Sequence, residues 1–410
     1  MAAIASTVEF RRLSPKMIFV VALLTAVFAA SVVDVVIPIT ILDIAETFSV
    51  LPGTVAQLDS LIAIASVATA LFLARFISVF RYKSVVLTGL LSIALCAVGL
   101  FLAPTFPVVQ IVVLLNGIGS VMIGVAAESF IGNSYPLDKK AKAIGWIAAA
   151  GAFANAVGAP IVGFITGIGG WHSVFIWFTL PVAVVSLILV LLVFPNYPSE
   201  HQLNVRKEPF MTGFKQVLAN RSVVACFVST FFGKAFGLGG AIFEVTFLRQ
   251  VFSASPGFAA LIGPLAGLML ITVGALVGGH LVNCVGRKRL TVVAILSAGV
   301  FTLLSYFMWN LSGFLALRWP AAFFIGITAA ASSNLTLEQV PRSRGTVMSL
   351  SSAFGGVGTA VGIAIAGTVL NLFVDATIGF QAVGLTVGIF AFIGGSVIFF
   401  FAKDPVRSNV

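Results

Sequence analysis

The sequence is poor in charge. Only 9% of its 410 residues are Asp, Glu, Lys or Arg, whereas 60% are hydrophobic, and the mean hydropathy is +1.14. A water-soluble domain carries about 25% charged residues, and its surface leaves too much of the chain in water to hide this many apolar side chains. The shortage of charge therefore excludes a soluble domain and indicates a protein that lies in lipid.

Residues that carry catalytic or crosslinking chemistry are also scarce. The three cysteines, Cys96, Cys226 and Cys284, are scattered through apolar stretches and form no disulfide framework. Three histidines are too few and too dispersed for a metal site, and the chain has neither a GxxxxGK[ST] phosphate loop nor a G-x-S-x-G nucleophile elbow. We therefore expect no enzyme, no metal and no cofactor.

Long apolar stretches dominate what is present. Each is long enough to cross a hydrocarbon core of about 30 Å, which takes about 20 helical residues, and none shows the alternation typical of a barrel strand. The first follows Arg11, Arg12 and Lys16 and is too long for a signal peptide, so we expect an uncleaved helix. The sequence predicts an all-α integral membrane protein with twelve transmembrane helices. These lie at roughly 17–40, 57–80, 84–103, 107–133, 142–168, 172–194, 222–248, 257–283, 290–310, 313–338, 345–372 and 377–402.

The basic residues orient these spans. An even number of crossings places both termini on one side. Of the 23 lysines and arginines, all but Arg75, Lys234, Arg249 and Arg318 fall on that side. Basic connections face the cytoplasm, so we expect a multi-pass protein of the plasma (inner) membrane with both termini inside. This placement explains the charge of +10 without a nucleic-acid partner.

The chain divides into two similar halves. The longest connection, 195–221, separates a bundle at 1–194 from one at 222–410, and its residues 210–219 are compatible with an interfacial helix. RYKSVV at 81–86 and YPLDKKAKAIG at 135–145 each have a basic counterpart 205 residues later, in GRKRLT at 286–291 and VPRSRGTVMSL at 340–350. A shared offset predicts an internal duplication, and paired six-helix repeats are a transporter architecture.

These loops resemble those of the major facilitator superfamily, and more narrowly its twelve-span drug and metabolite proton antiporters, the arabinose- and purine-efflux branch. The family pattern is G-x-L-x-D-R-x-G-R-K. The second-half copy runs from Gly279 to Lys288 but has Asn283 at the acid, and the first-half copy has Ser78 there. The resemblance implies a role in locking one conformation, although the missing acids question that lock. Lys83, Gly286, Arg287 and Lys288 match the pattern, whereas Arg81 stands at a glycine position and Asn283 at the acid position.

Two further stretches resemble the antiporters. In the fifth span, Gly158, Pro160 and Gly163, followed by a Gly-Trp-His sequence at 170–172, are similar to the antiporter motif. Small residues and proline permit close contact and bending, and ordinary packing is the alternative. Asp34 and Pro38 match the first-span pattern of drug/proton antiporters, in which the acid takes part in cation or proton handling. The fourth span instead has Val113 where antiporters often have Arg, so that residue's role is not carried over.

Charged residues inside spans need an explanation, because each costs about 2.5–3.5 kcal/mol at a helix centre. We expect Asp34 to carry a proton or to serve as a structural partner. Lys234, near the middle of the seventh span, could pair with Asp34 across a central cavity or bind an anionic substrate. Glu244 lies about 80° around the same helix from Lys234, facing the cavity or the interface.

The remaining charges lie nearer the span ends. Glu128 and Glu338 precede basic loops, where pairing with loop bases is the alternative to proton transport. Arg75 and Arg318 are expected to snorkel, and Asp59 and Arg249 to be interfacial. We assign proton coupling to Asp34 and Glu128. We add Glu338 and Arg344 to the loop and fifth-span residues that are expected to control the change of conformation. The predicted substrate cavity holds Asp34, Asn116, Phe153, Asn155, Phe231, Lys234, Phe236, Glu244, Asn334 and Phe354.

These features predict a secondary active transporter. It would export a small, amphipathic molecule by alternating access in exchange for protons, as a monomer in the lipid bilayer. Two alternatives stay open. One is a uniporter or anion-linked carrier that uses Lys234, and the other is a membrane receptor or assembly protein without transport.

Overall fold

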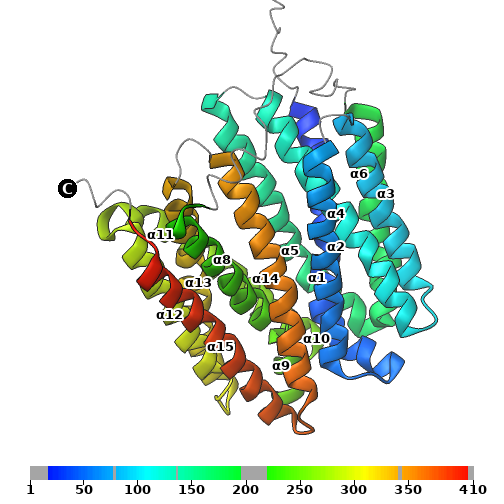
Figure 1. The fold of residues 1–410 in the computed structure, drawn as a ribbon. Coiled ribbons are helices and arrows are strands. Elements are labelled where there is room, and N and C mark those ends of the chain that lie inside the picture. The colour runs from blue at the N-terminus through cyan, green and yellow to red at the C-terminus, as the bar shows by residue number, and fades with distance from the viewer. Residues whose placement is uncertain (1–16, 77–79, 135–136, 195–218, 340–343, 405–410) are drawn as a thin grey trace, which may run out of the picture.

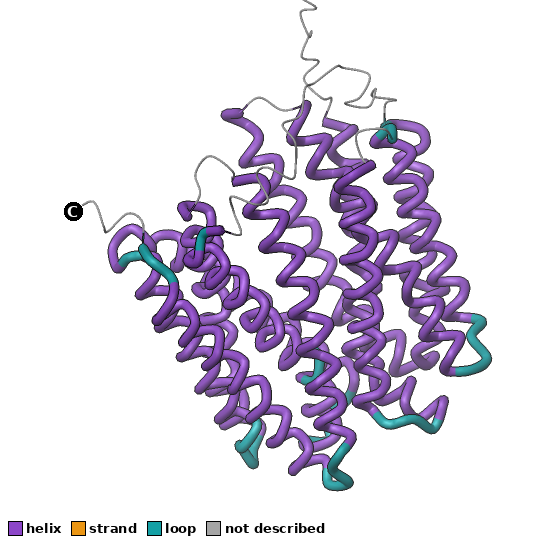
Figure 2. Tube along the Cα trace, viewed as in Figure 1, coloured by secondary structure: helices purple, strands orange, loops and turns teal. Residues whose placement is uncertain are grey.

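The computed structural model describes residues 17–76, 80–134, 137–194, 219–339 and 344–404. Within these ranges the elements are helices joined by short loops, and no strand occurs among them (Figure 2). In lipid a spanning segment must satisfy its own backbone hydrogen bonds, and a helix does so within one segment. The expected all-α architecture is thereby confirmed. The connection at 195–218, with its predicted interfacial helix, lies outside the described residues.

The N-terminal half forms six crossings. The first four are α1 (Met17–Phe48), α2 (Pro52–Phe76), α3 (Tyr82–Phe101) and α4 (Phe106–Ser134). The fifth is α5 (Leu137–Val174), and the sixth continues from it through a short π-helix, η1 (Phe175–Thr179), into α6 (Leu180–Val193).

One glycine makes the reversal between the fifth and sixth crossings. In the described part of the chain, eleven helical stretches are long and apolar enough to span a membrane, and one of them, Ala149–Val193, has 45 residues. At 1.5 Å per residue it would measure about 68 Å, twice the hydrocarbon core. Gly170 interrupts it with φ 74° and ψ 171°, a left-handed conformation that only glycine adopts readily. The stretch is therefore two crossings, in agreement with the twelve expected.

The C-terminal half is less regular. Its seventh crossing is α8 (Arg221–Ala241) followed, after a break, by α9 (Glu244–Val251). The eighth comprises α10 (Pro256–Ala260), η3 (Leu261–Leu265) and α11 (Ala266–Val285). The last four are α12 (Arg287–Ser305), α13 (Leu311–Gln339), α14 (Arg344–Asn371) and α15 (Ala376–Phe401). The sequence predicted one continuous seventh span and missed the break.

Corresponding helices make corresponding contacts in the two halves. In the first, α1 packs on α5 and α6, α4 on α2 and α3, and α3 on α6. In the second, α8 packs on α14 and α15, α13 on α11 and α12, and α12 on α15. Each half is thus a six-helix bundle with the same arrangement, and α1 and α8 hold equivalent positions.

The two bundles contact each other where α2 packs on α14, where α5 packs on the eighth crossing (α10, η3 and α11), and where α1 packs on α9. Figure 1 shows the bundles close together at the lower end and wider apart at the upper end, where α8 and α12 begin. We call the lower end, with the connections at 49–51 and 372–375, the contact end. The upper end, where Arg81, Lys83 and Arg287–Arg289 lie, is the basic end.

Candidate functional site

Asp34 is an accessible carboxylate in the middle of a buried helix. Its neighbours Val33, Val35 and Val36 are buried, whereas Asp34 itself is exposed. Because α1 is surrounded by α2, α4, α5 and α6, an exposed side chain halfway along it borders an internal space. Such a group can meet a proton or a ligand within the membrane.

Asn116 of α4 positions this carboxylate. Its Nδ2 donates a hydrogen bond of 3.0 Å to Asp34 Oδ1, and the Asn116 side chain is fully buried. Ser120, one turn further along α4, has its hydroxyl 3.4 Å from both Asn116 Oδ1 and the Ala30 carbonyl oxygen. Because the buried Asn116 amide contacts Ser120 through its oxygen and Asp34 through its nitrogen, its N–H donor stays directed at Asp34.

A second acid and a thiol lie near this pair. Asp59, half-buried on α2, is close enough to Asp34 for the two carboxylates to interact electrostatically. Cys96 of α3 is buried close to Asp34 and to the backbone of Asn116. The polar cluster therefore draws on four helices of the first bundle. The sequence interpretation placed Asp59 at the interface, near the start of the span predicted at 57–80.

Lys234 is the corresponding charge of the second bundle. It lies past the middle of α8, deep among the helices, and is exposed although the next two residues, Ala235 and Phe236, are buried. Its stem runs beside α14, where a Cβ added to Gly355 would lie 3.3 Å from Lys234 Cγ. Among the described residues Lys234 makes no ion pair with Asp34, so the expected bridge across the cavity is not formed in this structure.

The predicted aromatic lining is only partly accessible. Phe153 of α5 is 60% exposed and lies 5.9 Å from the Phe28 ring on α1. Phe231 and Phe354 are half-buried, the latter stacked on Phe227 at 5.3 Å. Phe236 is 3% exposed and packs in the core, so it has little surface to offer a ligand.

Two predicted cavity amides bond within their own helices. Asn155 Nδ2 donates to the Gly151 carbonyl at 3.0 Å, and Asn334 Nδ2 donates to the Ala330 carbonyl at 2.9 Å. Both side chains are half-buried. These bonds use only the Nδ2 donors, so the side-chain oxygen of each amide can still accept a hydrogen bond from a ligand.

Glu244 and Arg318 form a buried salt bridge inside the second bundle. Glu244 Oε2 lies 3.0 Å from Arg318 Nη2, with side chains 8% and 5% exposed. Arg318 also donates to Thr302 Oγ1 at 3.4 Å, and the Tyr306 hydroxyl donates to the Gly240 carbonyl at 2.9 Å. Glu244 was placed in the cavity and Arg318 was expected to snorkel. The structure instead gives Glu244 an ionic partner in its own bundle and keeps Arg318 away from the surface.

The fifth-span motif lies at the junction of the bundles. Gly158 and Gly163 are buried and Pro160 is half-buried. A Cβ on Gly163 would lie 2.9 Å from Gly257 Cα and 3.0 Å from the Pro256 carbonyl oxygen, both in or beside α10. Gly163 thus allows α5 to approach the other bundle, which gives the motif a geometric role.

The loop motifs lie at the basic end. Arg81 precedes α3 without capping it, and Lys83 Nζ donates to the Leu191 carbonyl at 2.8 Å. Gly286 begins α12 with φ 95°, Lys288 N donates to Asp404 Oδ2 at 3.3 Å, and Arg287 is half-buried. Glu128 is exposed and Glu338 half-buried. The side chains of Asn283 and Arg344, and residue Ser78, lie outside the described residues.

Polar contacts join the bundles at the contact end. Arg249 of α9 forms a salt bridge with Asp43 of α1, in which Nη2 lies 3.0 Å from Asp43 Oδ1 and Nη1 contacts Oδ2. Asn371 of α14 accepts from Gly53 N at 3.0 Å and donates to Thr54 Oγ1 at 2.9 Å. A Cβ on Gly53 would lie 2.0 Å from the Gly367 carbonyl oxygen. The sequence interpretation named none of these as partners, since they are far apart in the chain.

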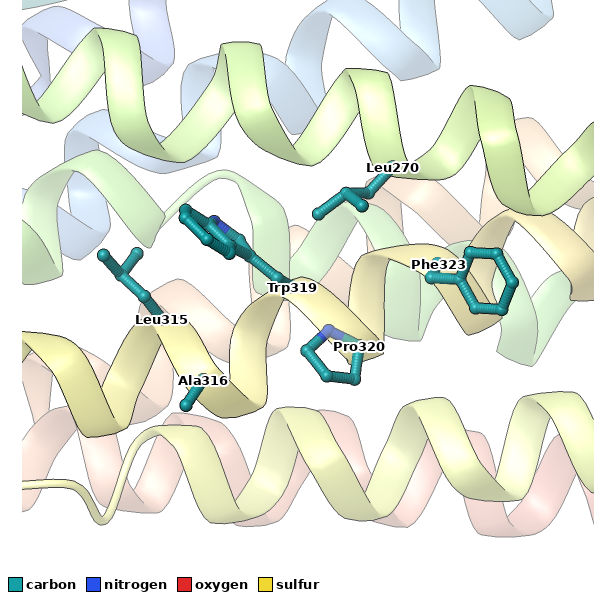
Figure 3. Close-up of a pocket in the computed structure, with 6 residues that line it drawn as sticks. All are labelled: Leu270, Leu315, Ala316, Trp319, Pro320 and Phe323. Carbon is teal, nitrogen blue, oxygen red and sulfur yellow. The ribbon is translucent and has the colours of Figure 1, made fainter.

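An apolar groove lies apart from the polar cluster, between α11 and α13 (Figure 3). Its volume is about 460 Å³, and Leu270, Leu315 and Trp319 border it. The lining is almost entirely hydrocarbon and includes none of the predicted site residues. None of its lining residues has a titratable side chain that would hold a proton.

Two bundles of six spanning helices, with polar groups at mid-membrane on the equivalent helices α1 and α8, define an α-helical membrane transporter. The chain belongs to the Major Facilitator Superfamily, whose family model matches residues 20–273 and 230–410. The expected family is thereby confirmed.

Similar proteins agree with this assignment. The chain is 23% identical over 285 residues to multidrug resistance protein 2 of Bacillus subtilis, covering 67% of this chain and 70% of that protein. It is 31% identical over 133 residues to the 3-(3-hydroxy-phenyl)propionate transporter of Escherichia coli, covering 32% and 30%. A bacterial homolog of the human lysosomal transporter Spinster, in an inward-facing and unoccupied conformation, superposes with a TM-score of 0.77 at 17% identity. That match covers 95% of this chain and 98% of the homolog.

Proposed function

We propose that the protein exports a small, amphipathic molecule in exchange for protons. The observation that carries the proposal is the accessible Asp34 carboxylate at mid-membrane, held by Asn116 at 3.0 Å. Away from bulk water the charged form of a carboxylate is costly. Asp34 is therefore suited to take up a proton whenever no cation lies close enough to compensate its negative charge.

Alternating access follows from the contacts between the bundles. The polar contacts described at the contact end seal it, whereas Asp34 and Lys234 stay accessible. This favours a state open towards the basic end. With basic connections in the cytoplasm, that end faces the cell interior, in a multi-pass plasma membrane protein with both termini inside. Rocking of one bundle against the other would then expose the same groups outside.

Coupling requires that proton and substrate favour different states. Asp34 would take up its proton from outside, and substrate bound from the cytoplasm would favour proton release. Glu128 lies on α4 about 18 Å beyond Asn116 along the helix axis, towards the basic end. We assign it the next position on the route of the released proton. The similarity to a multidrug resistance protein supports export rather than import.

Proteoliposomes test the proposal. An entrapped pH indicator would report proton movement after addition of the lipophilic cation ethidium or the anion naphthalene-2-sulfonate. We expect at least one probe to move protons with wild-type protein, and Asp34→Asn to abolish this movement while exchange of the probe across the membrane persists. Asp375→Asn is the matched control, because Asp375 only caps α15 and asparagine caps equally well. Wild-type proton movement in the Asp34→Asn variant would contradict the proposal.

A further inference from the structure

Lys234 has no anionic partner among the described residues, although it lies in the middle of the membrane. Two salt bridges in the described part of the chain join Asp43 to Arg249 and Glu244 to Arg318. Asp34 accepts its hydrogen bond from Asn116 instead. A charged lysine at this depth is costly unless it is compensated. The exposed side chain therefore leaves a place for a counter-ion that the described chain does not fill.

The packing of α8 on α14 fixes the stem of this lysine. A Cβ added at Gly355 would lie 3.3 Å from Lys234 Cγ and 3.9 Å from its Cε. One turn towards the basic end, the hydroxyls of Thr230 and Ser351 lie 3.4 Å apart. A Cβ on Gly358 would lie only 2.2 Å from the Phe231 carbonyl oxygen, so the two helices touch closely beside Lys234. The lysine stem therefore runs along α14 beside Gly355, where the absence of a side chain leaves room for it.

Apolar side chains flank Lys234 on its own helix. Phe231 lies three residues before it and is half-buried, and Leu238 lies four residues after it and is 44% exposed. Residues three and four apart share a helix face. A ligand whose charged group meets Lys234 therefore has apolar surface available on both sides along α8.

We propose that Lys234 binds the anionic group of the transported molecule, and that the substrate class is amphipathic organic anions, carboxylates or sulfonates with an apolar body along Phe231 and Leu238. This inference rests on the proposed transport function and adds to it the charge of the substrate. It also separates the two mid-membrane charges, because Asp34 serves the proton and Lys234 the substrate.

Binding to purified protein in detergent micelles tests the inference without any proton gradient. Three probes share one ring system: naphthalene-2-sulfonate is an anion, naphthalene-2-sulfonamide is neutral and (2-naphthyl)methylammonium is a cation. Calorimetry would give their affinities for wild-type protein and for Lys234→Gln. We expect the sulfonate to bind wild-type protein on the order of tenfold or more tightly than the sulfonamide, as for a charge-assisted hydrogen bond.

Lys234→Gln should remove this preference, Lys234→Arg should retain most of it, and Lys234→Glu should prefer the ammonium probe. Lys403→Gln, which changes an exposed lysine at the end of α15, is the matched control and should behave as wild type. Equal affinity for the three probes, including no binding of any, would overturn the inference. So would a sulfonate preference that persists in Lys234→Gln.

The two proposals fail separately. Anion preference without Asp34-dependent proton movement would refute the coupling and leave the Lys234 site standing. Proton movement driven by ethidium, with no anion preference in wild-type protein, would support the coupling and refute the Lys234 site. If Lys234 serves only to pair with Asp34 in another state, Asp34→Asn and Lys234→Gln would impair transport equally and neither would change probe selectivity, which also overturns the inference.

Discussion

Arg249 on α9 binds Asp43 on α1 with both terminal nitrogens of its guanidinium group, and thereby joins the two bundles at the contact end. Nη1 also donates to the Ile39 carbonyl oxygen at 3.3 Å. Both side chains are largely shielded, at 14% and 23% exposure. A two-point ion pair of this kind is directional, so it stabilises one arrangement of the bundles over others.

Breaking this pair should open the contact end. For Asp43→Asn we expect the population of the opened state to rise on the order of tenfold, because hydrogen bonds to charged groups contribute about 1.5–3 kcal/mol. Val36→Cys would report it, since Val36 is buried on the same face of α1, two turns from Asp43 towards the basic end. In a Cys284→Ser background, a membrane-impermeant maleimide should label this cysteine faster in the Asp43→Asn variant.

The control for this experiment is Asp375→Asn, which changes a carboxylate at the same end without a contact between the bundles. The reversed pair, Asp43→Arg with Arg249→Asp, should restore slow labelling. Equal labelling rates in wild-type protein and Asp43→Asn would show that the pair does not hold the contact end closed.

A larger side chain at Gly163 should have a similar effect by steric means. The branched side chain of Gly163→Val would collide with Gly257 and Pro256 across the junction of the bundles, so we expect loss of transport and faster labelling at position 36. Gly167→Val is the control one turn along α5, where an added Cβ meets nothing within 4 Å. Transport by Gly163→Val at the rate of Gly167→Val would refute this assignment.

The Glu244–Arg318 pair should matter for stability. Removing one partner leaves a buried charge without compensation, which costs about 3–5 kcal/mol. Glu244→Gln and Arg318→Met should therefore each lower the thermal unfolding midpoint, whereas Glu244→Leu combined with Arg318→Met should recover much of the loss. Unfolding followed by tryptophan fluorescence would measure this, with Asp375→Asn as reference. Single variants as stable as the reference would show that the pair contributes little.

Asp59 should modulate the proton site without replacing it. Two carboxylates close together disfavour simultaneous ionisation, so we expect Asp59→Asn to reduce proton-coupled flux less than Asp34→Asn does. The double variant should be no worse than Asp34→Asn alone, because the acids would act as one unit. Additive losses in proteoliposomes would instead indicate two independent proton sites.

The architecture was predictable because its signals are local and repeated. Apolar runs gave the spans, and the matching loops at 81–86 and 286–291 indicated paired halves. The same locality explains what was missed. The break after Ala241 ends a helix within continuous apolar sequence, where hydropathy does not change. The reversal at Gly170, in contrast, falls between the spans predicted at 142–168 and 172–194.

The site was predictable only as separate residues. Asp34, Asn116 and Lys234 stand out as polar groups in apolar spans, but periodicity within one helix says nothing about which neighbour each will meet. Glu244 and Arg318 are 74 residues apart in sequence, and Asp43 and Arg249 are separated by 206. Their pairing depends on how the helices pack. From the sequence alone, Arg249 was assigned to the interface, Arg318 was expected to snorkel and Glu244 was placed in the cavity.

The sealed contact end also determines which inhibitors can act on this state. In the proposed orientation, a compound added outside the cell meets the closed surface around Asp43 and Arg249, whereas one inside reaches Asp34 and Lys234. A polar blocker designed against the mid-membrane groups would therefore be inert when applied to intact cells and active on inverted vesicles. The side of the membrane from which an inhibitor can act is thus determined by a few contacts between the bundles at the contact end.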